Sequence, residues 1–337
     1  MSSEIKAITA ILPARDEEAT IEAAVRSLAA QAEIAEIRVV NDHSTDRTGE
    51  ILSRLAAELP RLRVLEAPPL PAGWVGKNHA AWFGSQGAAT DWLLFTDADV
   101  RHLPGSAAHA LANGELREGA LVSYSPAQHL ETWWERAMIP FVFGRLAARY
   151  PYEQVNRSDS PLAAANGQYL LIRRETYQAI GGHRAVSDSV LEDVAIARRA
   201  KSAGIPLHFL PGPGIAETRM YRNFGAMWEG WTKNLYPLVG ATPMAAAGEL
   251  LSVFPIEEMV LFALGLFYPW IWPFAIVWLA MRIWDYARGL QKQRFPLSCI
   301  EYWALGLVLY CAALMVSAWR YSMGTVAWKG RTYPVGS

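Results

Sequence analysis

The chain has 337 residues, and its 31 Lys and Arg nearly balance its 32 Asp and Glu, so no charge excess indicates a nucleic-acid partner. Charged residues make up 19% of the sequence, below the roughly 25% of an average soluble domain, whereas Trp and Tyr are abundant at 14 and 13. These aromatic residues gather where proteins meet a bilayer, so the composition predicts contact with a membrane. Both cysteines lie in the apolar C-terminal third, which excludes a disulfide framework and favours a reducing compartment.

The first apolar run ends at Pro13 and is too short for the core of a signal peptide or for a membrane span. We therefore expect residues 1–235 to form a cytoplasmic domain. Apolar runs alternate there with amphipathic segments, which predicts an α/β domain with a mostly parallel sheet. The expected strands are residues 7–14, 36–42, 61–68 and 92–100, and the expected helices include residues 17–32 and 46–59.

Polar side chains follow three of these strands, in "PARDEE", "NDHSTDRT" and "TDADV". An open α/β sheet binds its ligands beyond the carboxyl ends of its strands, so we expect these segments at one functional edge. Asp97 and Asp99 point to the same side of an extended chain, where each raises the energetic cost of the other's charge. Such a pair is either a solvated turn or a site for Mg²⁺ or Mn²⁺, and the coincidence of three acidic strand ends favours the metal site.

Three other acidic positions have both a structural and a functional interpretation. Asp42 either caps the helix that follows or accepts hydrogen bonds from the base or ribose of a nucleotide. Glu192 and Asp193 lie near the start of an amphipathic helix, where the helix dipole by itself favours carboxylates. The residues alone leave both interpretations open.

The C-terminal third contains long apolar runs. Residues 259–281 and 302–319 carry no charged side chain, and each run is long enough to cross about 30 Å of hydrocarbon. A weaker run at residues 235–256 is interrupted by Pro243 and Glu249, and it is either an interfacial helix or a further span.

An ordered set of motifs covers nearly the whole chain. They are "ILPARDEEATI", "VVNDHSTDRT", "PAGWVGKNHA", "FTDADV", "AAANGQYLLIRRETYQAIGGH", "LEDVAIARRAKSAG", "WEGWTKN" and "WKGRTYP". The set resembles an inverting family-2 glycosyltransferase of GT-A fold, which implies a nucleotide-diphospho-sugar transferase domain. Within that family the chain is similar to membrane-attached enzymes that act on lipids, such as hopene-associated and carotenoid-type glycosyltransferases.

The resemblance implies how a sugar-nucleotide donor is bound. It places the base or ribose on Asp42, beside Asn41, which stands where many relatives have a first Asp. It makes Asp99 the metal ligand, with Asp97 as its partner near the ribose and diphosphate. Further residues expected to line the substrate site are Pro13, Arg15, Glu17, Asn166, Gly167, Gln168 and Trp231. A Gly167 turn with ordinary polar neighbours explains the segment "NGQYLL" almost as well as contact with the acceptor.

The resemblance also assigns the proton acceptor: Asp193 is the general base, with Glu192 beside it. Many relatives carry a Gln-or-Arg-x-x-Arg-Trp motif, but "MWEGW" has Met227 and Gly230 at the two polar positions, which argues against processive polymerisation. The positive charge expected near the diphosphate comes from Lys77, Arg222 or Lys233.

These expectations describe a metal-dependent, non-processive transfer from a UDP- or GDP-linked sugar to a lipid acceptor, without nucleic acid as a partner. A sugar-nucleotide pyrophosphorylase is one alternative, but such enzymes use a glycine-rich loop after the first strand, and "ILPARDEE" has no glycine. The other alternative is a catalytically inactive, membrane-anchored protein that binds nucleotide sugars. The presence of all the acidic residues above argues against it.

We expect a multi-pass protein of the cell inner membrane, in which residues 236–337 form a membrane region with two or three transmembrane helices and a short basic tail. The number of spans stays open. Basic residues between 282 and 301 favour three spans by the positive-inside rule, whereas a tail on the side of the reaction favours two. The aromatic segment at residues 131–152 either lies at the lipid headgroups or packs inside the domain.

Overall fold

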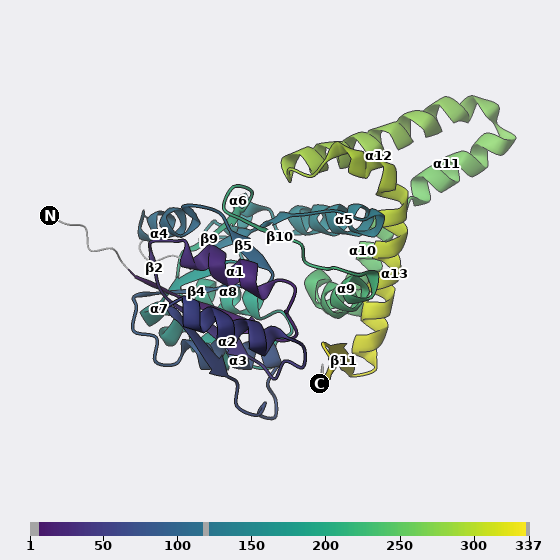
Figure 1. Ribbon diagram of the computed structural model, residues 1–337. Helices are drawn as coiled ribbons and strands as arrows, with labels where there is room; N and C mark the ends of the chain where they lie inside the picture. Colours follow the sequence, from purple (N-terminus) through teal and green to yellow (C-terminus); the bar gives the residue numbers. More distant parts are fainter. Residues whose placement is uncertain (1–6, 117–120, 335–337) are drawn as a thin grey trace. The chain divides into compact units, whose positions relative to one another are not determined.

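The computed structural model describes residues 7–116 and 121–334, and the chain forms two compact units (Figure 1). The first unit comprises Met1–His129 and Tyr150–Met220, and the second comprises Leu130–Arg149 and Tyr221–Ser337. The domain boundary expected at residue 235 therefore differs from the observed division. Residue 235 falls inside helix α9 (Phe224–Val239), and residues 130–149 belong with the C-terminal part of the chain.

The first unit is built on a seven-stranded sheet in the order β3-β2-β1-β4-β8-β6-β9. Strand β8 is antiparallel to both of its neighbours, and the other pairs are parallel, so the predicted mostly parallel sheet is confirmed. The strands are β1 (Ile8–Ala14), β2 (Ile34–Asn41), β3 (Leu62–Glu66), β4 (Trp92–Phe95), β6 (Leu121–Ser125), β8 (Leu170–Arg173) and β9 (Leu207–Pro211).

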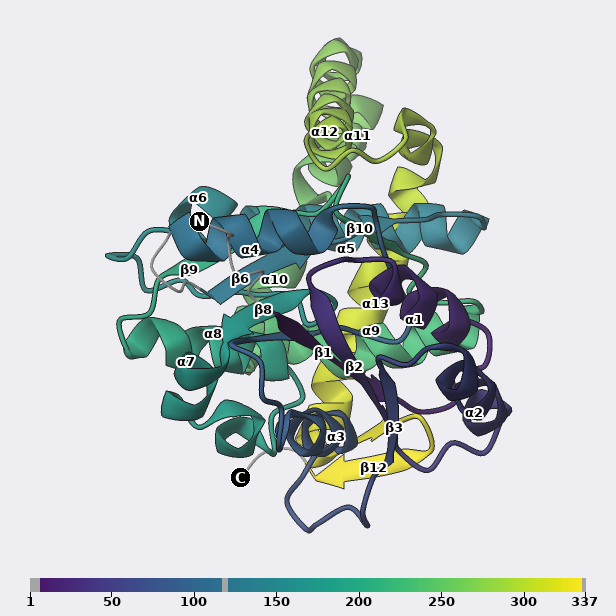
Figure 2. The same cartoon turned by 60° about the vertical axis from the view of Figure 1, so that its left-hand side comes forward.

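Helices cover both faces of this sheet, as Figure 2 shows. Because successive strand residues point to opposite faces, Ala10 and Leu12 of β1 join one core, whereas Ile11 joins the other. The first face is covered by α1 (Ile21–Ala29), α2 (Thr48–Glu58) and α4 (Ser106–Leu116). The second is covered by α3 (Gly76–Ser85), α7 (Arg174–Ala179), the short 3₁₀ helix η1 (Gly182–Val186) and α8 (Glu192–Ser202), with α6 (Tyr152–Val155) nearby in the same core.

A second, three-stranded sheet follows the Asp-x-Asp segment and holds it in place. Its order is β5-β10-β7, with β5 (Val100–His102), β10 (Ala216–Thr218) and β7 (Ala127–Gln128). The strand expected over residues 92–100 is therefore two strands, because β4 ends at Phe95 and β5 begins at Val100. The hydroxyl of Thr218 donates to the backbone carbonyl of Asp99 at 3.1 Å, which fixes the connecting loop.

The second unit is mainly helical. Its helices are α5 (Trp133–Arg149), α9 (Phe224–Val239), α10 (Pro243–Val253), α11 (Ile256–Phe267), α12 (Trp272–Lys292) and α13 (Trp303–Ser322), with 3₁₀ helices η2 (Pro269–Ile271) and η3 (Leu297–Tyr302) and a hairpin of β11 (Thr325–Trp328) and β12 (Arg331–Pro334). Helix α13 packs against α5 and α9. The expected basic tail forms the hairpin, and residues 335–337 at its end lie outside the described residues.

Helix α5 explains the aromatic segment at residues 131–152. Trp134 and Phe141 are buried, whereas Trp133 is 51% exposed. Most of this aromatic segment is therefore part of the core of the second unit, because α5 packs against α13.

One helix among the described residues is long and apolar enough to cross a membrane: the 26-residue stretch Leu297–Ser322. The pair Pro243–Val253 and Ile256–Phe267, bent by 46°, adds a second if it forms one broken span. The uninterrupted span expected at residues 259–281 is wrong, because α11 ends at Phe267 and η2 begins at Pro269. Proline lacks a backbone N–H and restricts the residue before it to non-helical conformations, so the helix cannot continue. Tyr268 accordingly has φ −129° and ψ 86°.

Helices α11 and α12 run back along each other as a helical hairpin (Figure 1). Many of their large apolar side chains are exposed: Ile256, Met259, Val260, Leu264, Leu266, Phe267, Phe274, Ile276, Val277, Trp278, Met281 and Trp284. An exposed apolar surface of this extent is typical of contact with lipid or with another protein.

Candidate active site

The carboxyl ends of β1 and β2 are joined by hydrogen bonds between the loops that follow them. The Nη1 atom of Arg15 donates to the backbone carbonyl of Asp42 at 2.8 Å. The backbone N–H of Glu17 donates to the hydroxyl of Thr48 at 2.8 Å, and the Glu17 carboxylate accepts from Thr20 at 3.0 Å. Arg15 and Glu17, both predicted to bind substrate, therefore build the edge on which Asp42 sits.

Asp42 and Asn41 have different environments. Asp42 is 5% exposed, and its Oδ1 lies 3.2 Å from Nδ1 of His43. The amide of Asn41 instead donates to both carboxylate oxygens of Glu66 at 3.1 and 3.0 Å, and its Oδ1 accepts from the Ser44 N–H at 3.3 Å. Asn41 thus links β2 to β3 and closes the loop, which gives its amide a structural role.

Lys77 connects the Asp-x-Asp loop with the start of α8. It is the second residue of α3, and its Nζ lies 2.7 Å from Oδ1 of Asp97 and 2.8 Å from Oε1 of Glu192. Burial alone would lower the pKa of Lys77, but the two carboxylates outweigh that effect and hold the pKa well above its ordinary value. The lysine is therefore a permanent cation between two carboxylates.

Asp193 lies beside this ion-pair network at the start of α8, where its position at a helix terminus is confirmed. Its Oδ2 accepts from the backbone N–H of Gly167 at 2.9 Å, and its Oδ1 accepts from the N–H of Val194 at 2.8 Å. Burial and the neighbouring Glu192 raise the pKa of Asp193 to about 6, against the opposing influence of Lys77 and the two N–H donors. A carboxylate with this pKa is ionised at neutral pH and able to accept a proton.

Gly167 is placed so close to these groups that a side chain would not fit freely. A Cβ atom there would lie 3.1 Å from Oε1 of Glu192 and 3.3 Å from Nζ of Lys77. Its neighbours complete a turn: Asn166 Oδ1 accepts from the N–H of Gln168 at 2.9 Å, and Thr96 donates to the Gln168 carbonyl at 2.7 Å. The turn interpretation of "NGQYLL" is thus observed, and contact of Asn166 or Gln168 with an acceptor stays a prediction.

Several of the residues described above line a small recess. It is lined by Pro13, Lys77, Ala81, Phe95, Thr96, Asp97, Gly167, Leu170, His183, Glu192 and Asp193. His183 was not predicted from the sequence, although it ends the "IGGH" motif. It is buried with Nδ1 3.0 Å from the Tyr177 hydroxyl, its ring centroid lies 4.6 Å from that of Phe95, and burial lowers its pKa to about 3. The imidazole is therefore neutral and helps to shape the recess.

The donor set of the Asp-x-Asp loop fits a divalent cation only in part. Within residues 7–116 and 121–334, no group of three or more His, Cys, Asp and Glu side chains is arranged to hold a metal ion. Mg²⁺ often binds through one or two carboxylates and takes its other ligands from substrate phosphates and water. The half-buried Asp97 and Asp99 fit that pattern.

Three predicted substrate contacts lie in the second unit. Trp231 is 3% exposed and packs between Phe143 and Tyr221, with ring centroids 6.3 and 6.2 Å apart. Lys233 lies with Nζ 4.2 Å from the ring centroid of Trp328. The third residue, Arg222, is exposed just before α9. Among the three predicted cations, the recess of the first unit contains Lys77.

The departure from the Gln-or-Arg-x-x-Arg-Trp motif has a packing reason. A Cβ atom at Gly230 would overlap the ring and hydroxyl of Tyr221, and Met227 is fully buried. Both positions that carry polar side chains in many relatives are therefore used for the core of this unit.

Comparisons with known proteins agree with this fold. A mannosyltransferase from Pyrobaculum calidifontis, solved in complex with GDP-Man and Mn²⁺, superposes with a TM-score of 0.54 at 18% identity, over 93% of this chain and 86% of that one. The first unit therefore has a GT-A-like fold. The sequence profile of glycosyl transferase family 2 matches residues 9–181, and the chain belongs to this family of glycosyltransferases.

Curated relatives extend the similarity to nearly the whole chain. A 4,4'-diaponeurosporenoate glycosyltransferase of Staphylococcus aureus (strain MRSA252) is 28% identical over 98% of this chain and 89% of the relative. The protein of the same name from strain USA300 is 27% identical over the same shares. The resemblance to carotenoid-type family-2 glycosyltransferases is thereby confirmed, and a pyrophosphorylase is excluded as the family of this chain.

Proposed function

We propose that the protein transfers a sugar from a UDP- or GDP-linked donor to a hydroxyl group of a membrane lipid, with inversion at the anomeric carbon. One observation carries this proposal. In a single recess, Lys77 joins Asp97 of the Asp-x-Asp loop to Glu192, and Glu192 is adjacent to Asp193. The arrangement brings groups suited to a diphosphate next to a carboxylate suited to accept a proton.

The donor binds at the carboxyl edge of the sheet in this mechanism. Asp42 accepts hydrogen bonds from the base or ribose, on the loops that Arg15 braces. Asp97 and Asp99 would hold Mg²⁺ or Mn²⁺, which when bound supplies positive charge to the departing diphosphate. The ammonium group of Lys77 adds a second positive charge at the same place, and it needs no metal to do so.

Asp193 accepts the proton of the acceptor hydroxyl as that oxygen attacks the anomeric carbon. The new carbon–oxygen bond forms while the bond to the diphosphate breaks, so a single displacement inverts the centre. The N–H of Gly167 holds one carboxylate oxygen of Asp193 in a fixed direction. Because burial and Glu192 raise the pKa of Asp193 to about 6, the carboxylate is a stronger base than an ordinary aspartate.

A lipid acceptor is supported by the second unit and by the relatives. The helix Leu297–Ser322 is apolar enough to cross a membrane, and α11 and α12 expose many large apolar side chains. The Staphylococcus aureus relatives are named for 4,4'-diaponeurosporenoate, a carotenoid. We infer a location at the cell inner membrane with the first unit in the cytoplasm, where sugar nucleotides are found.

Donor and metal are tested together by thermal unfolding of the full chain with UDP- and GDP-sugars, with and without Mg²⁺ or Mn²⁺. We expect one donor class to raise the melting temperature only when the metal is present, because a ligand that binds the native state stabilises it. Asp99→Asn should abolish this shift and the transfer, whereas the exposed Asp91→Asn should retain both. Full activity in excess chelator would contradict the metal assignment.

The acceptor is tested by incubating the enzyme and radiolabelled donor with extracted membrane lipids. We expect the label to enter the organic phase. The transferred sugar in the lipid product should have the opposite anomeric configuration to the sugar in the donor. Efficient transfer to a water-soluble sugar or protein, without transfer to lipid, would show that the acceptor class is wrong.

A further inference from the structure

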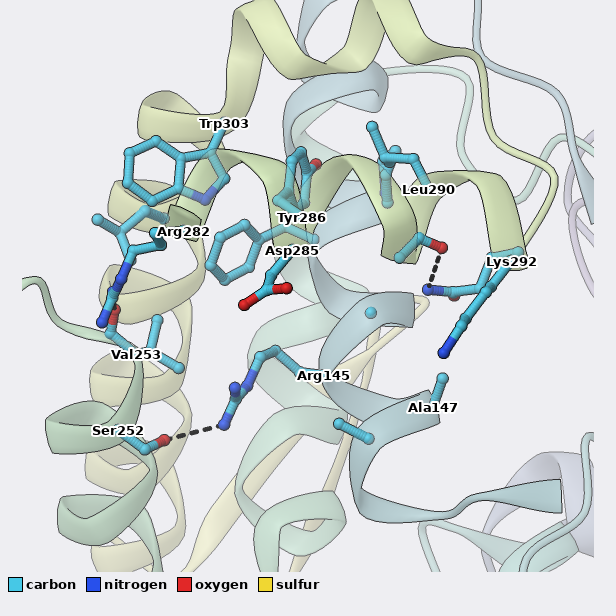
Figure 3. Close-up of a pocket in the computed structure, with 17 residues that line it drawn as sticks. Arg145, Ala147, Ser252, Val253, Arg282, Asp285, Tyr286, Leu290, Lys292 and Trp303 are labelled. Atoms are coloured by element: carbon cyan, nitrogen blue, oxygen red, sulfur yellow. Dashed lines mark hydrogen bonds between the residues drawn. The ribbon is translucent and has the colours of Figure 1, made fainter. Parts of the chain in front are cut away.

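The second unit contains a cavity of about 480 Å³ between α5 and α12, closed by the end of α10 and the start of α13 (Figure 3). This volume lies within the roughly 300–1,000 Å³ of small-molecule sites. The cavity belongs to neither the recess nor the Asp-x-Asp loop, since all its lining residues are in the second unit.

Most of the wall is apolar. Phe141 and Ala148 line it from α5, Leu290 from α12, and Trp303 and Leu307 from α13. A wall of this kind favours an apolar guest over water, because burying apolar surface is favourable and polar partners for water are scarce.

Polar side chains reach the cavity from α5, α10 and α12, and one of them, Arg282, is paired with the Glu258 carboxylate at 2.6 Å. Arg145 donates to the Glu249 carboxylate at 2.8 Å and to the Ser252 hydroxyl at 2.9 Å, so its charge is already compensated. In Figure 3 the carboxylate of Asp285 extends from α12 toward Arg145, and Lys292 extends from the same helix toward α5. Asp285 and Lys292 are exposed, and neither forms an ion pair with another described residue. They form a polar rim suited to a charged head group.

Two glycines line the cavity, Gly144 on α5 and Gly289 on α12. A Cβ atom at Gly289 of α12 would meet nothing within 4 Å, and one at Gly144 of α5 would meet only the Gln293 amide at 3.7 Å. Glycine inside a helix is less stable than alanine, and neither position has the left-handed backbone that requires glycine. By contrast, Gly306 is required by packing, because its Cβ would overlap the Ala137 carbonyl. At Gly144 and Gly289 a larger side chain would therefore extend into free space of the cavity.

The cavity adjoins the exposed apolar surface of α12. Trp278, Met281 and Trp284 are exposed on that helix, and Asp285 and Tyr286 line the cavity directly after them in sequence. Met281 and Asp285 are four residues apart and therefore lie on the same side of α12, so the exposed apolar surface reaches the edge of the cavity.

We propose that this cavity binds the apolar chain of an amphiphilic lipid, with the polar head group beside Asp285 and Lys292. The lipid is either the acceptor of the sugar or a phospholipid of the bilayer, since both have an apolar chain and a polar head group. The inference rests on the proposed function only in the first case. Binding of the chain does not require sugar transfer.

Photolabelling of the full chain tests the proposal. The purified protein is placed in phosphatidylcholine vesicles that contain a diazirine-bearing fatty acid or a diazirine-bearing phosphatidylcholine, irradiated, and mapped by peptide mass spectrometry. We expect adducts on the cavity-lining parts of α5 and α12. Gly289→Leu fills the space and should reduce these adducts by at least about tenfold.

Gly248→Leu is the matched control, because Gly248 is also a helix glycine with nothing within 4 Å of its Cβ, but it does not line the cavity. Its labelling should equal that of the wild type. Gly144→Leu fills the cavity from the opposite wall and gives an independent measurement if Gly289→Leu lowers the melting temperature. Absence of adducts on the lining residues, or equal labelling of all variants, would overturn the proposal.

Kinetic measurements distinguish whether the bound lipid is the acceptor or a bilayer phospholipid. If the acceptor occupies the cavity, Gly289→Leu raises the apparent KM for the lipid acceptor and leaves the KM for the sugar nucleotide unchanged. If a bilayer phospholipid occupies it, labelling is lost while both KM values stay at wild-type levels. Photolabelling needs no turnover. A failure of lipid transfer would therefore contradict the proposed function but not the proposal that the cavity binds a lipid.

Discussion

Lys77 holds together two carboxylates that would otherwise repel each other at the edge of the sheet. Removing Lys77 from this partly buried network would leave the buried Glu192 carboxylate without its compensating charge, which is destabilising. The same lysine carries positive charge to the place where the donor diphosphate is expected. At the scale of single residues, its contacts therefore link the stability of the recess with the proposed chemistry.

Asp193→Asn tests the proposed general base. Asparagine keeps the size of the side chain and one oxygen for the Gly167 N–H, but it cannot accept the proton. We expect nucleotide binding within a few-fold of the wild type and a turnover lower by about 10² or more, the usual effect of losing a general base. Titration of donor binding beside a kcat measurement checks this. Equal losses in binding and turnover would mean that Asp193 is structural.

The pH dependence of kcat should report the ionisation of Asp193. The base acts only when deprotonated, so kcat should fall as the pH drops through about 6, the pKa to which burial and Glu192 raise this carboxyl. Glu192→Gln removes the neighbouring negative charge, which lowers the pKa of Asp193 and moves the acid limb to lower pH. The exposed Glu175→Gln should leave the limb in place. An unmoved limb in Glu192→Gln would contradict the assignment.

At the scale of elements, the contact between α5 and α13 explains why the aromatic segment of α5 is mostly buried. The two helices approach closely at Gly306, where any side chain would meet the Ala137 carbonyl. Of the two interpretations of this segment, the burial of its side chains favours packing inside the protein over contact with lipid headgroups. Trp133 is the exception, because it is exposed. Helix packing of this kind depends on small residues at the crossing point.

Gly306→Val tests this packing. Overpacking of a tight contact costs about 1–3 kcal/mol, so we expect a lower free energy of unfolding for the second unit, measured by denaturant titration of intrinsic fluorescence. Gly248→Ala, on an open helix surface, should instead be neutral or slightly stabilising. A neutral Gly306→Val would show that the helices are able to separate without cost.

At the scale of the whole molecule, the proposed attachment to a membrane rests on the apolar helix of the second unit. Val308 is 61% exposed on α13, within the helix that is long and apolar enough to cross a bilayer. An arginine at the centre of a transmembrane helix costs about 2.5–3.5 kcal/mol. Val308→Arg should therefore reduce the fraction of protein retained in membranes after an alkaline carbonate wash.

Leu116→Arg is the control for that measurement, because Leu116 is 83% exposed but belongs to the first unit. Its retention should match the wild type. Release of the wild-type protein by a simple salt wash would contradict insertion of α13 and indicate an electrostatic attachment.

The sequence by itself determined the first four strands of the large sheet, the first two helices and the acidic residues at the strand ends, because periodicity and strand-end polarity are local properties. It did not reveal that Lys77 pairs with Glu192 or that Gly167 contacts Asp193, since these residues meet only when α3 and α8 pack on the same sheet face. Hydropathy predicted an uninterrupted span where Pro269 ends the regular backbone, because an apolar count does not register the missing N–H of proline. The cavity was equally hidden, since Gly144 and Gly289 acquire a shared role only when α5 and α12 face each other.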